Sequence, residues 1–185
     1  MDDINYRTVA SSRISITELM IPAYANFGGK IHGGILLSLM DKAAYACASK
    51  HAGGYCVTVS VDGVDFLAPV EVGELVSMEA SVHYVGRTSM LVGISVTAEN
   101  VMTEIRKHTN TSYFTMVAKG ADDRPREVPG LVLETADEVR LFRERLKRRE
   151  LKGRYKEELR ELHRRIATEE CADGLAGERC AVRLR

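Results

Sequence analysis

The stretch Asn26-Phe27-Gly28-Gly29-Lys30-Ile31-His32-Gly33-Gly34-Ile35-Leu36-Leu37-Ser38-Leu39-Met40-Asp41 decides the fold of this chain. It joins a glycine-rich approach, an apolar helix start and a single carboxylate. Asp41 follows six residues of which five are apolar. Burying a carboxylate without partners costs several kcal/mol or forces it to take up a proton. Asp41 therefore needs either a partner or a function.

A central helix is predicted immediately after Gly34. Apolar residues recur at spacings of three and four from Ile35 to Cys47, and Gly53 and Gly54 mark the end of a helix of about five turns. This helix is apolar nearly all round. Such a helix is normally wrapped by a sheet on one side and packed against another element or subunit on the other. We therefore expect the chain to self-associate.

Strands are predicted on both sides of this helix. Arg13–Ile21 alternates apolar and polar positions, which is typical of a half-buried strand that ends before Pro22. Five later segments are rich in β-branched and aromatic residues. They are Tyr55–Val61, Asp65–Val70, Leu75–Val85, Ser89–Ala98 and Ile105–Ala118. This order predicts an α+β fold with an antiparallel sheet curled around the helix.

A composition change divides the chain into a first domain, residues 1–130, and a C-terminal extension, residues 131–185. Ala121–Gly130 is polar with two prolines and reads as an exposed linker. Thr135 and Glu138 have capping-box spacing, so a second helix is predicted to run to about Glu170. Its apolar spacing slips at Leu146 to Leu151 and Gly153 weakens its middle, so we expect a bend or two shorter helices. Residues 171–185 show no pattern and are expected to be disordered.

The C-terminal extension is basic, although the whole chain is neutral. Arg140–Lys156 holds nine Lys or Arg against two Glu, whereas the chain has 26 Lys and Arg against 26 Asp and Glu. The simplest interpretation is a solvated amphipathic helix packed on its own domain or on a neighbouring subunit. Phosphate or nucleic-acid contact is the alternative. The balanced net charge predicts neither a nucleic-acid nor a membrane partner.

The cysteines predict an intracellular protein without a structural metal. Cys47, Cys56, Cys171 and Cys180 lack CxxC spacing, which argues against zinc and for reduced thiols in the cytoplasm. The longest apolar run is far below the roughly 18–20 residues that span a bilayer. We therefore expect a soluble cytoplasmic protein with no metal.

Three motifs in this order resemble the hotdog-fold acyl-CoA thioesterases, in particular the cytosolic, YciA-like acyl-CoA hydrolase group. The first motif comprises Asn26, the Gly33–Gly34 pair and Asp41. The second is Asp62–Gly73, DGVDFLAPVEVG, and the third is Val85–Ser89, VGRTS. The resemblance covers residues 8–130 and implies a hotdog fold.

The resemblance implies hydrolysis of fatty acyl-CoA to fatty acid and CoA. Asp41 is then the general base or nucleophile, and Asn26 of the partner subunit orients the water or the thioester. It also implies a hotdog dimer, assembled as a trimer of dimers, and no cofactor apart from the CoA of the substrate. On its own, Asn26 is better interpreted as a loop residue bonding its own backbone. Asp41 alone reads as a surface acid paired with a cation.

The substrate also needs hydrogen-bond donors. The helix start at Gly33–Gly34 offers free amides for a developing oxyanion, but Asp41 lies about 10 Å further along the helix axis. His32 is predicted to serve packing or substrate contact. The candidates for binding the CoA phosphates are Arg87, Thr88, Ser89, Lys119, Arg124 and Arg126, each of which also reads as a solvated surface residue.

Three other functions remain open. A hotdog subunit can bind acyl-CoA without cleaving it, as a sensor whose basic helix touches nucleic acid. A hydratase or dehydratase would want a histidine five residues after Asp41, where Ala46 stands. A cysteine hydrolase would need Cys47 or Cys56, neither of which has a neighbouring cation to lower its pKa.

Overall fold

The computed structural model describes residues 5–166, 177–181 and 183. The chain forms two compact units, residues 1–143 and 144–185. Helix α3, Ala136–Ile166, continues from the first unit into the second. The predicted domain boundary after residue 130 remains a prediction.

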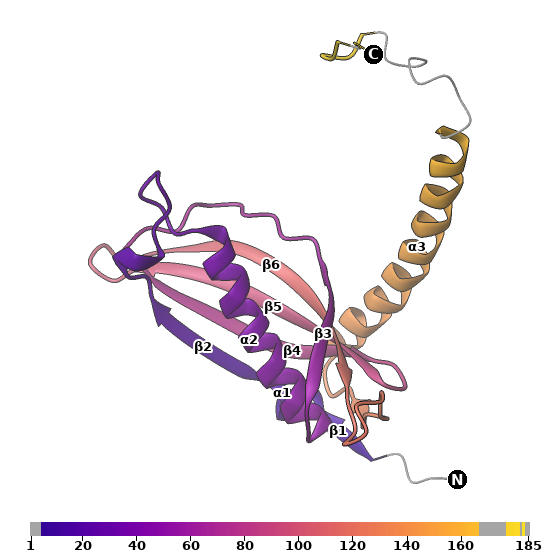
Figure 1. Ribbon diagram of the computed structural model, residues 1–185. Coiled ribbons are helices and arrows are strands. Elements are labelled where there is room, and N and C mark those ends of the chain that lie inside the picture. Colours follow the sequence, from indigo (N-terminus) through magenta and orange to yellow (C-terminus); the bar gives the residue numbers. More distant parts are fainter. Residues whose placement is uncertain (1–4, 167–176, 182, 184–185) are drawn as a thin grey trace. The chain divides into compact units, whose positions relative to one another are not determined.

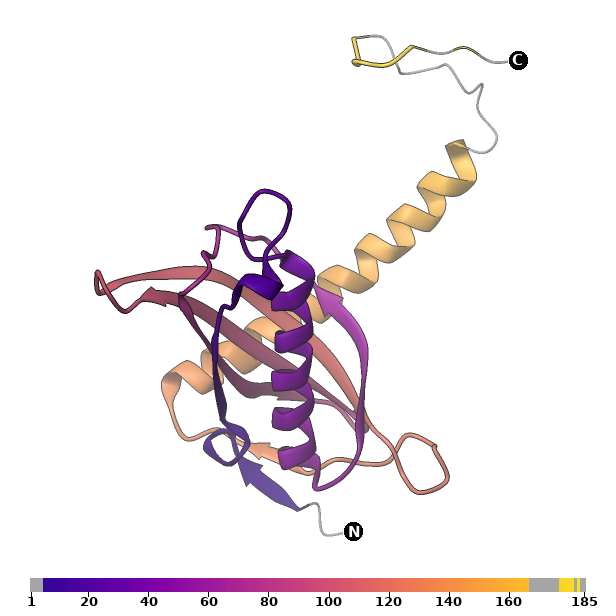
Figure 2. The same cartoon turned by 60° about the vertical axis from the view of Figure 1, so that its left-hand side comes forward.

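The first unit contains one long helix on one face of an antiparallel sheet (Figure 1). The strands are β2 Ile14–Leu19, β3 Cys56–Asp62, β4 Leu75–Val85, β5 Ser89–Asn100 and β6 Ile105–Ala118, in the order β2-β4-β5-β6-β3. Helix α2, Gly33–Ala52, contacts all five strands. Figure 2 shows the sheet curving behind α2. The predicted hotdog architecture is confirmed.

The core lies between α2 and the sheet. Alternate residues of β5, from Met90 to Ala98, are buried, as are Phe114, Met116 and Ala118 of β6. Met40, Ala44 and Cys47 of α2 are fully buried. The strand period of two and the helix period of 3.6 thus bring two apolar surfaces together.

Helix α2 begins at Gly33, in agreement with the predicted helix start at Gly33–Gly34. His32 is its N-cap, and Gly53 ends it with φ +68°. Glycine adopts this left-handed conformation without the steric cost that a Cβ brings. A short 3-10 helix, η1 Pro22–Tyr24, connects β2 to the loop before α2.

The predicted strand Asp65–Val70 is wrong. This segment crosses the start of α2 without forming a strand, although the Leu67 N–H donates to the Thr109 carbonyl at 2.8 Å. Gly63 has φ +54°, and Pro69 lacks an N–H, so a regular ladder cannot form here. The segment instead places the Phe66 ring over Gly33, where an added Cβ would lie 3.1 Å from the ring.

Three short elements escaped prediction. They are β1 Tyr6–Thr8, α1 Val9–Ser12 and β7 Gly130–Val132. β1 and β7 form a parallel pair on their own. Elements of three or four residues are too short to show a period.

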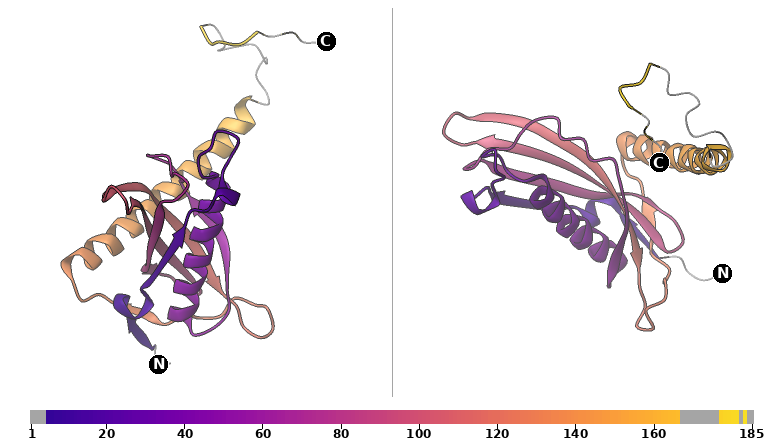
Figure 3. Two further views of the ribbon diagram at one scale, coloured as in Figure 1. Left: turned by 90° about the vertical axis from the view of Figure 1, so that its left-hand side faces the viewer. Right: turned by 45° about the horizontal axis from the view of Figure 1, so that its top comes forward.

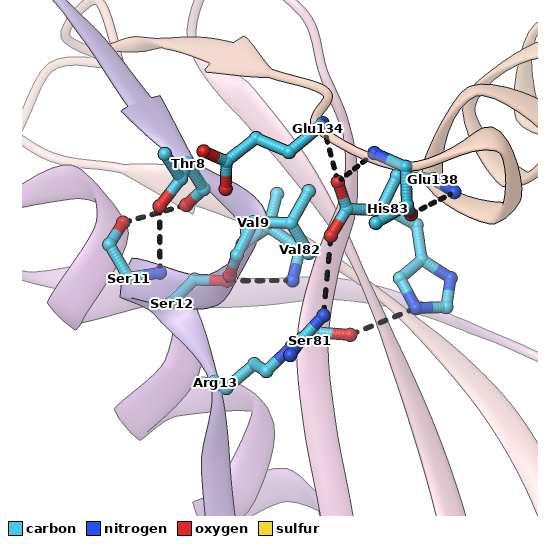
Figure 4. A network of polar contacts seen from close by, with 11 residues as sticks. Thr8, Val9, Ser11, Ser12, Arg13, Ser81, Val82, His83, Glu134 and Glu138 are labelled. Atoms are coloured by element: carbon cyan, nitrogen blue, oxygen red, sulfur yellow. Dashed lines mark hydrogen bonds and ion pairs between the residues drawn. The ribbon is translucent and has the colours of Figure 1, made fainter.

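The predicted capping box at the start of α3 is confirmed. The Glu138 N–H donates to Thr135 Oγ1 at 3.2 Å, and the Thr135 N–H donates to Glu138 Oε2 at 3.2 Å. Arg13 also donates to Glu138 Oε1 at 3.2 Å, and this network joins β2 to the start of α3 (Figure 4). The first turn of α3 is therefore fixed within the first unit.

Helix α3 is continuous through Gly153 and does not divide into two helices. Ion pairs three and four residues apart support it, such as Arg148–Glu144 and Arg160–Glu157. Its predicted end at Glu170 lies outside the described residues, as do residues 171–176 of the segment expected to be disordered. Among the described helices, none is long and apolar enough to span a membrane.

Candidate functional site

Asp41 is half-buried in the third turn of α2 and is held by Thr58 of β3. Thr58 Oγ1 donates to Asp41 Oδ1 at 2.6 Å. A bulge at Val59 shifts the pairing of β3 with β6 directly after Thr58. Bulges re-aim side chains and recur beside active sites. Sequence reasoning missed Thr58, because only the packing of β3 on α2 brings it to the carboxylate.

Asp41 and Thr58 line a hollow of about 390 Å³ on the surface of the first unit. The other lining residues are Lys42, Tyr45, Tyr55, Cys56 and Val57. Within the described part of the chain, Asp41 forms no ion pair, and its Oδ2 accepts no hydrogen bond. The interpretation of Asp41 as an acid paired with a cation therefore does not describe this structure. The carboxylate instead faces open space.

The helix start differs from the expectation at Gly34. The Gly34 N–H donates to His32 Nδ1 at 2.9 Å, so this amide is already used. A Cβ at Gly34 would lie 2.9 Å from the His32 ring, and glycine therefore makes room for this cap. The Gly33 N–H has no hydrogen-bond partner among the described residues. Of the two predicted donors, Gly33 remains available.

Asn26 lies in the exposed loop before α2 and holds its turn. Its Oδ1 accepts from the Gly28 N–H at 2.8 Å and from the Lys30 N–H at 3.2 Å. Within the described residues, its side-chain amide nitrogen has no partner, and no hydrogen bond joins Asn26 to Asp41. Asn26 Oδ1 thus bonds to the backbone of its own loop, as one of the two interpretations predicted. The Asn26 amide nitrogen is left as a hydrogen-bond donor.

Arg87, Thr88 and Ser89 lie together at the turn between β4 and β5. Arg87 lines a second hollow of about 670 Å³, which Arg7 and Arg126 also line. Arg87 is highly exposed and lies 3.9 Å from Glu127, an ion pair of little strength. Arg126 donates to the Ala52 carbonyl at 2.7 Å, so part of its guanidinium holds the end of α2.

Lys119 and Arg124 occupy the turn after β6 and are not among the lining residues of either hollow. Lys119 Nζ donates to the Asp123 carbonyl at 2.6 Å, and Arg124 lies 3.8 Å from Asp122. The structure therefore brings Arg87 and Arg126 together, but it does not join Lys119 and Arg124 to them.

The two cysteines of the first unit are unsuited to nucleophilic catalysis. Burial raises the pKa of the Cys47 thiol to about 12 and also raises the pKa of Cys56. The thiolate is the reactive form of cysteine, so both thiols are inert near neutral pH. No group of three or more His, Cys, Asp or Glu side chains suited to a metal occurs among the residues that the structure describes.

Comparisons with known sequences establish the family. Residues 28–105 match the model of the Thioesterase superfamily. Protein VdlD of Helicobacter pylori is 41% identical over 152 residues, which cover 82% of this chain and 87% of that protein. The uncharacterized acyl-CoA thioester hydrolase YkhA of Bacillus subtilis is 35% identical, with 76% and 82% covered. The cytosolic acyl coenzyme A thioester hydrolase of Mus musculus is 31% identical, with 80% and 38% covered.

Solved structures agree with this result. An apo-hexameric acyl-CoA thioesterase matches with a TM-score of 0.79 and 36% identity, covering 82% of this chain and 97% of that chain. An acyl-CoA hydrolase from Staphylococcus aureus, in complex with butyryl coenzyme A, coenzyme A and coenzyme A disulfide, matches with a TM-score of 0.76 and 28% identity, covering 88% and 99%. Further structures of that hydrolase are asparagine-to-alanine, aspartate-to-alanine and threonine-to-alanine mutants. This chain belongs to the Thioesterase superfamily, among the hotdog acyl-CoA thioesterases, and the predicted family is confirmed.

Proposed function

We propose that this protein hydrolyses fatty acyl-CoA to a free fatty acid and CoA, with Asp41 as the general base or nucleophile. The observation that carries the proposal is the Thr58–Asp41 hydrogen bond beside a surface hollow. It fixes one carboxylate oxygen and leaves the other facing the space where a thioester can enter.

The spacing of three residues supports this assignment. In the Staphylococcus aureus hydrolase the mutated asparagine, aspartate and threonine are separated by 15 and 17 residues. Asn26, Asp41 and Thr58 have these same separations. We therefore propose Thr58 as a third member of the site, next to Asn26 and Asp41.

Hydrolysis requires attack on the thioester carbonyl by water or by Asp41 itself. If Asp41 acts as a base, Oδ2 takes a proton from water as the new carbon–oxygen bond forms, and the carbon–sulfur bond then breaks. The departing thiolate of CoA recovers a proton, and the acyl group leaves as a carboxylate. A positioned base contributes typically about 10²- to 10⁴-fold to such a step. The proposed donor to the carbonyl oxygen is the N–H of Gly33 of the partner subunit, at the positive end of that subunit's helix dipole. Within one chain, Gly33 and Asp41 are eight residues apart on α2, about 12 Å along the helix axis, which is too far for both to act on one carbonyl.

His32 supports the helix start in this proposal and contacts the substrate, but it is not the base. Its Nδ1 accepts the Gly34 N–H, so that atom carries no proton and is already used. Protonating Nδ1 would remove the cap.

A second subunit completes the proposed site. Strand β3 is an edge of the sheet, and its Val59 and Val61 are 61% and 38% exposed. An exposed apolar edge strand is a template for pairing with another chain. Pairing two β3 edges in a dimer brings the two α2 helices close together, so that Asn26 of one subunit can reach Asp41 of the other. We propose that three such dimers form a hexamer, the state named for one matched thioesterase.

The phosphates of CoA are proposed to bind near the β4–β5 turn. Arg87, Thr88 and Ser89 offer a guanidinium and two hydroxyls there, and the remaining N–H groups of Arg126 face the same hollow. Lys119 and Arg124 remain candidates for phosphate contact at the neighbouring turn. No cofactor other than this CoA is proposed. We place the activity in the cytoplasm, following the name of the mouse relative.

Release of free thiol from a panel of acyl-CoAs tests the function directly. Wild-type protein is expected to release CoA, and Asp41→Asn is expected to lower kcat by at least about 10²-fold. Asp137→Asn, which changes an exposed acid in the first turn of α3, is the matched control and is expected to keep full activity. Tight binding of acyl-CoA without release of thiol would identify a sensor and refute the proposal.

Mixing two inactive variants tests the shared site. In a mixed dimer, the Asn26→Ala subunit supplies an intact Asp41 and the Asp41→Asn subunit supplies an intact Asn26. One of the two shared sites is therefore complete. We expect recovery of activity after subunit exchange, measured with differently tagged subunits. No recovery in verified mixed dimers would show that Asn26 and Asp41 do not act across the interface.

A further inference from the structure

Two exposed tyrosines lie beside Asp41. Tyr45 is 43% exposed on α2, and Tyr55 is 57% exposed just before β3. Their ring centroids are 6.2 Å apart with planes inclined by 59°. Both rings line the hollow that holds Asp41 and Thr58. Large aromatic surfaces left exposed together indicate a place where another molecule binds.

The position of the pair limits what it can contact. Residues four apart on a helix are neighbours, with about 5–6 Å between their Cβ atoms. Tyr45 therefore stands one turn beyond Asp41. A thioester whose carbonyl lies at Asp41 presents only its acyl group and the start of the pantetheine arm within this reach. The nucleotide lies at the far end of that arm.

The chemistry of the two rings distinguishes the acyl group from the pantetheine arm as their contact. The pantetheine arm carries amide groups that require hydrogen-bond partners, whereas the two rings offer flat apolar faces. An apolar acyl group matches those faces better. The hollow of about 390 Å³ is near the lower end of the range of ligand pockets, roughly 300–1,000 Å³. An acyl group with a ring next to the carbonyl fits within this volume.

The mutual tilt of the rings favours one compact group in particular. Aromatic pairs prefer tilted or offset arrangements with centroids about 4.5–7 Å apart, and such pairs add stabilisation beyond the buried area. A third ring placed against Tyr45 and Tyr55 gains this stabilisation, whereas a saturated ring of the same size gains only the area.

We propose that Tyr45 and Tyr55 form the acyl-recognition surface of this protein and favour thioesters whose acyl group carries an aromatic ring close to the carbonyl. The inference rests on the proposed function of Asp41. It adds aryl-containing acyl groups to the proposed substrate class and ranks them above saturated acyl groups of the same size.

The test compares phenylacetyl-CoA with cyclohexylacetyl-CoA, which differ in aromaticity and little in size. We expect wild-type kcat/KM to favour phenylacetyl-CoA by about two- to tenfold. Tyr45→Leu and Tyr55→Leu keep apolar bulk and are expected to lower this ratio toward one. Tyr45→Phe and Tyr55→Phe keep the rings and are expected to preserve it. Tyr155→Leu changes an exposed tyrosine of α3 that lines neither of the two hollows, and it serves as the control.

Four results separate the possible failures. An unchanged ratio in both leucine variants, with both substrates still hydrolysed, would overturn the inference. An equal loss for both substrates together with a smaller assembly in light scattering would assign the tyrosines to a subunit interface and also overturn it. If wild-type protein hydrolyses fatty acyl-CoA but neither ring-containing thioester, the inference is overturned and the proposed function stands. If it hydrolyses no acyl-CoA at all, the proposed function fails. The same comparison of Kd values on Asp41→Asn then decides the recognition inference by itself.

Discussion

The first turn of α2 is partly exposed, and its Gly33 N–H has no hydrogen-bond partner among the described residues, whereas two arginines close its last turn. Arg7 donates to the Lys50 and His51 carbonyls, both at 2.9 Å, and Arg126 donates to the Ala52 carbonyl at 2.7 Å. Figure 3 shows the two ends of this helix from two sides. One helix thus has a start left open for a ligand and an end fixed by protein groups.

This difference indicates that the last turn of α2 contributes to stability and that its first turn serves the reaction. The last carbonyls of a helix carry partial negative charge, which guanidinium groups satisfy. The first amides attract an anion or a developing oxyanion. Substitutions near the start and at Asp41 should therefore change turnover, and substitutions at the end should change the free energy of unfolding.

Outside Asn26 and Asp41, Thr58→Val is expected to have the largest effect on turnover. It removes a hydrogen bond to a charged group, worth about 1.5–3 kcal/mol, which corresponds to roughly ten- to hundredfold in kcat/KM. Thiol release measures the loss. Thr17→Val in β2 is the matched control, since its hydroxyl contacts only Ser77 on the opposite edge of the sheet. Equal activity of both variants would remove Thr58 from the site.

Arg7→Met tests the closed end. It leaves two carbonyls without their donor and is expected to lower the free energy of unfolding by about 2 kcal/mol, with kcat at saturating acyl-CoA unchanged below the melting transition. Urea denaturation measures the change. Arg143→Met, at an exposed arginine, is expected to have little effect. A loss of activity without a loss of stability in Arg7→Met would contradict the division of roles along α2.

Two glycine substitutions compare the ends directly. Gly53→Ala forces a Cβ into the left-handed region and is expected to destabilise by about 1 kcal/mol without changing turnover. Gly34→Ala displaces the His32 cap, which costs about 1 kcal/mol of stability. The higher helix propensity of alanine returns about 1 kcal/mol, so the two effects offset one another. Gly34→Ala should therefore keep the melting temperature and lower kcat/KM. The reverse pattern would show that the helix start is structural.

His51 makes the closed end sensitive to acid, and we expect this effect to be the smallest. Burial lowers the pKa of His51 below 6.5; Arg7 reinforces the shift, and the Pro129 carbonyl opposes it. Below about pH 6.5 the unfolded chain therefore binds this proton more readily than the folded chain. Stability falls as the pH drops through that value. Melting curves between about pH 8 and 5 should show a shallower decline for His51→Gln than for wild type.

Much of the fold could be predicted from periodicity. The bounds Leu75–Val85 and Ile105–Ala118 agree with β4 and β6, because long strands repeat their alternation many times. The prediction of a strand at Asp65–Val70 failed because the apolar residues of this segment cover the start of α2 without pairing with another strand. Only a contact between distant segments distinguishes such a cover from a strand.

The sequence by itself determined the central helix, the order of the main strands and the family to which they belong. These features depend on local spacing, which neighbouring residues specify completely. Tertiary structure alone decided that Thr58 meets Asp41, that Arg7 and Arg126 close α2, and that Tyr45 and Tyr55 share a hollow. Each of these contacts joins separate elements, because the packing of the sheet on α2, and not the spacing along the chain, sets their distance.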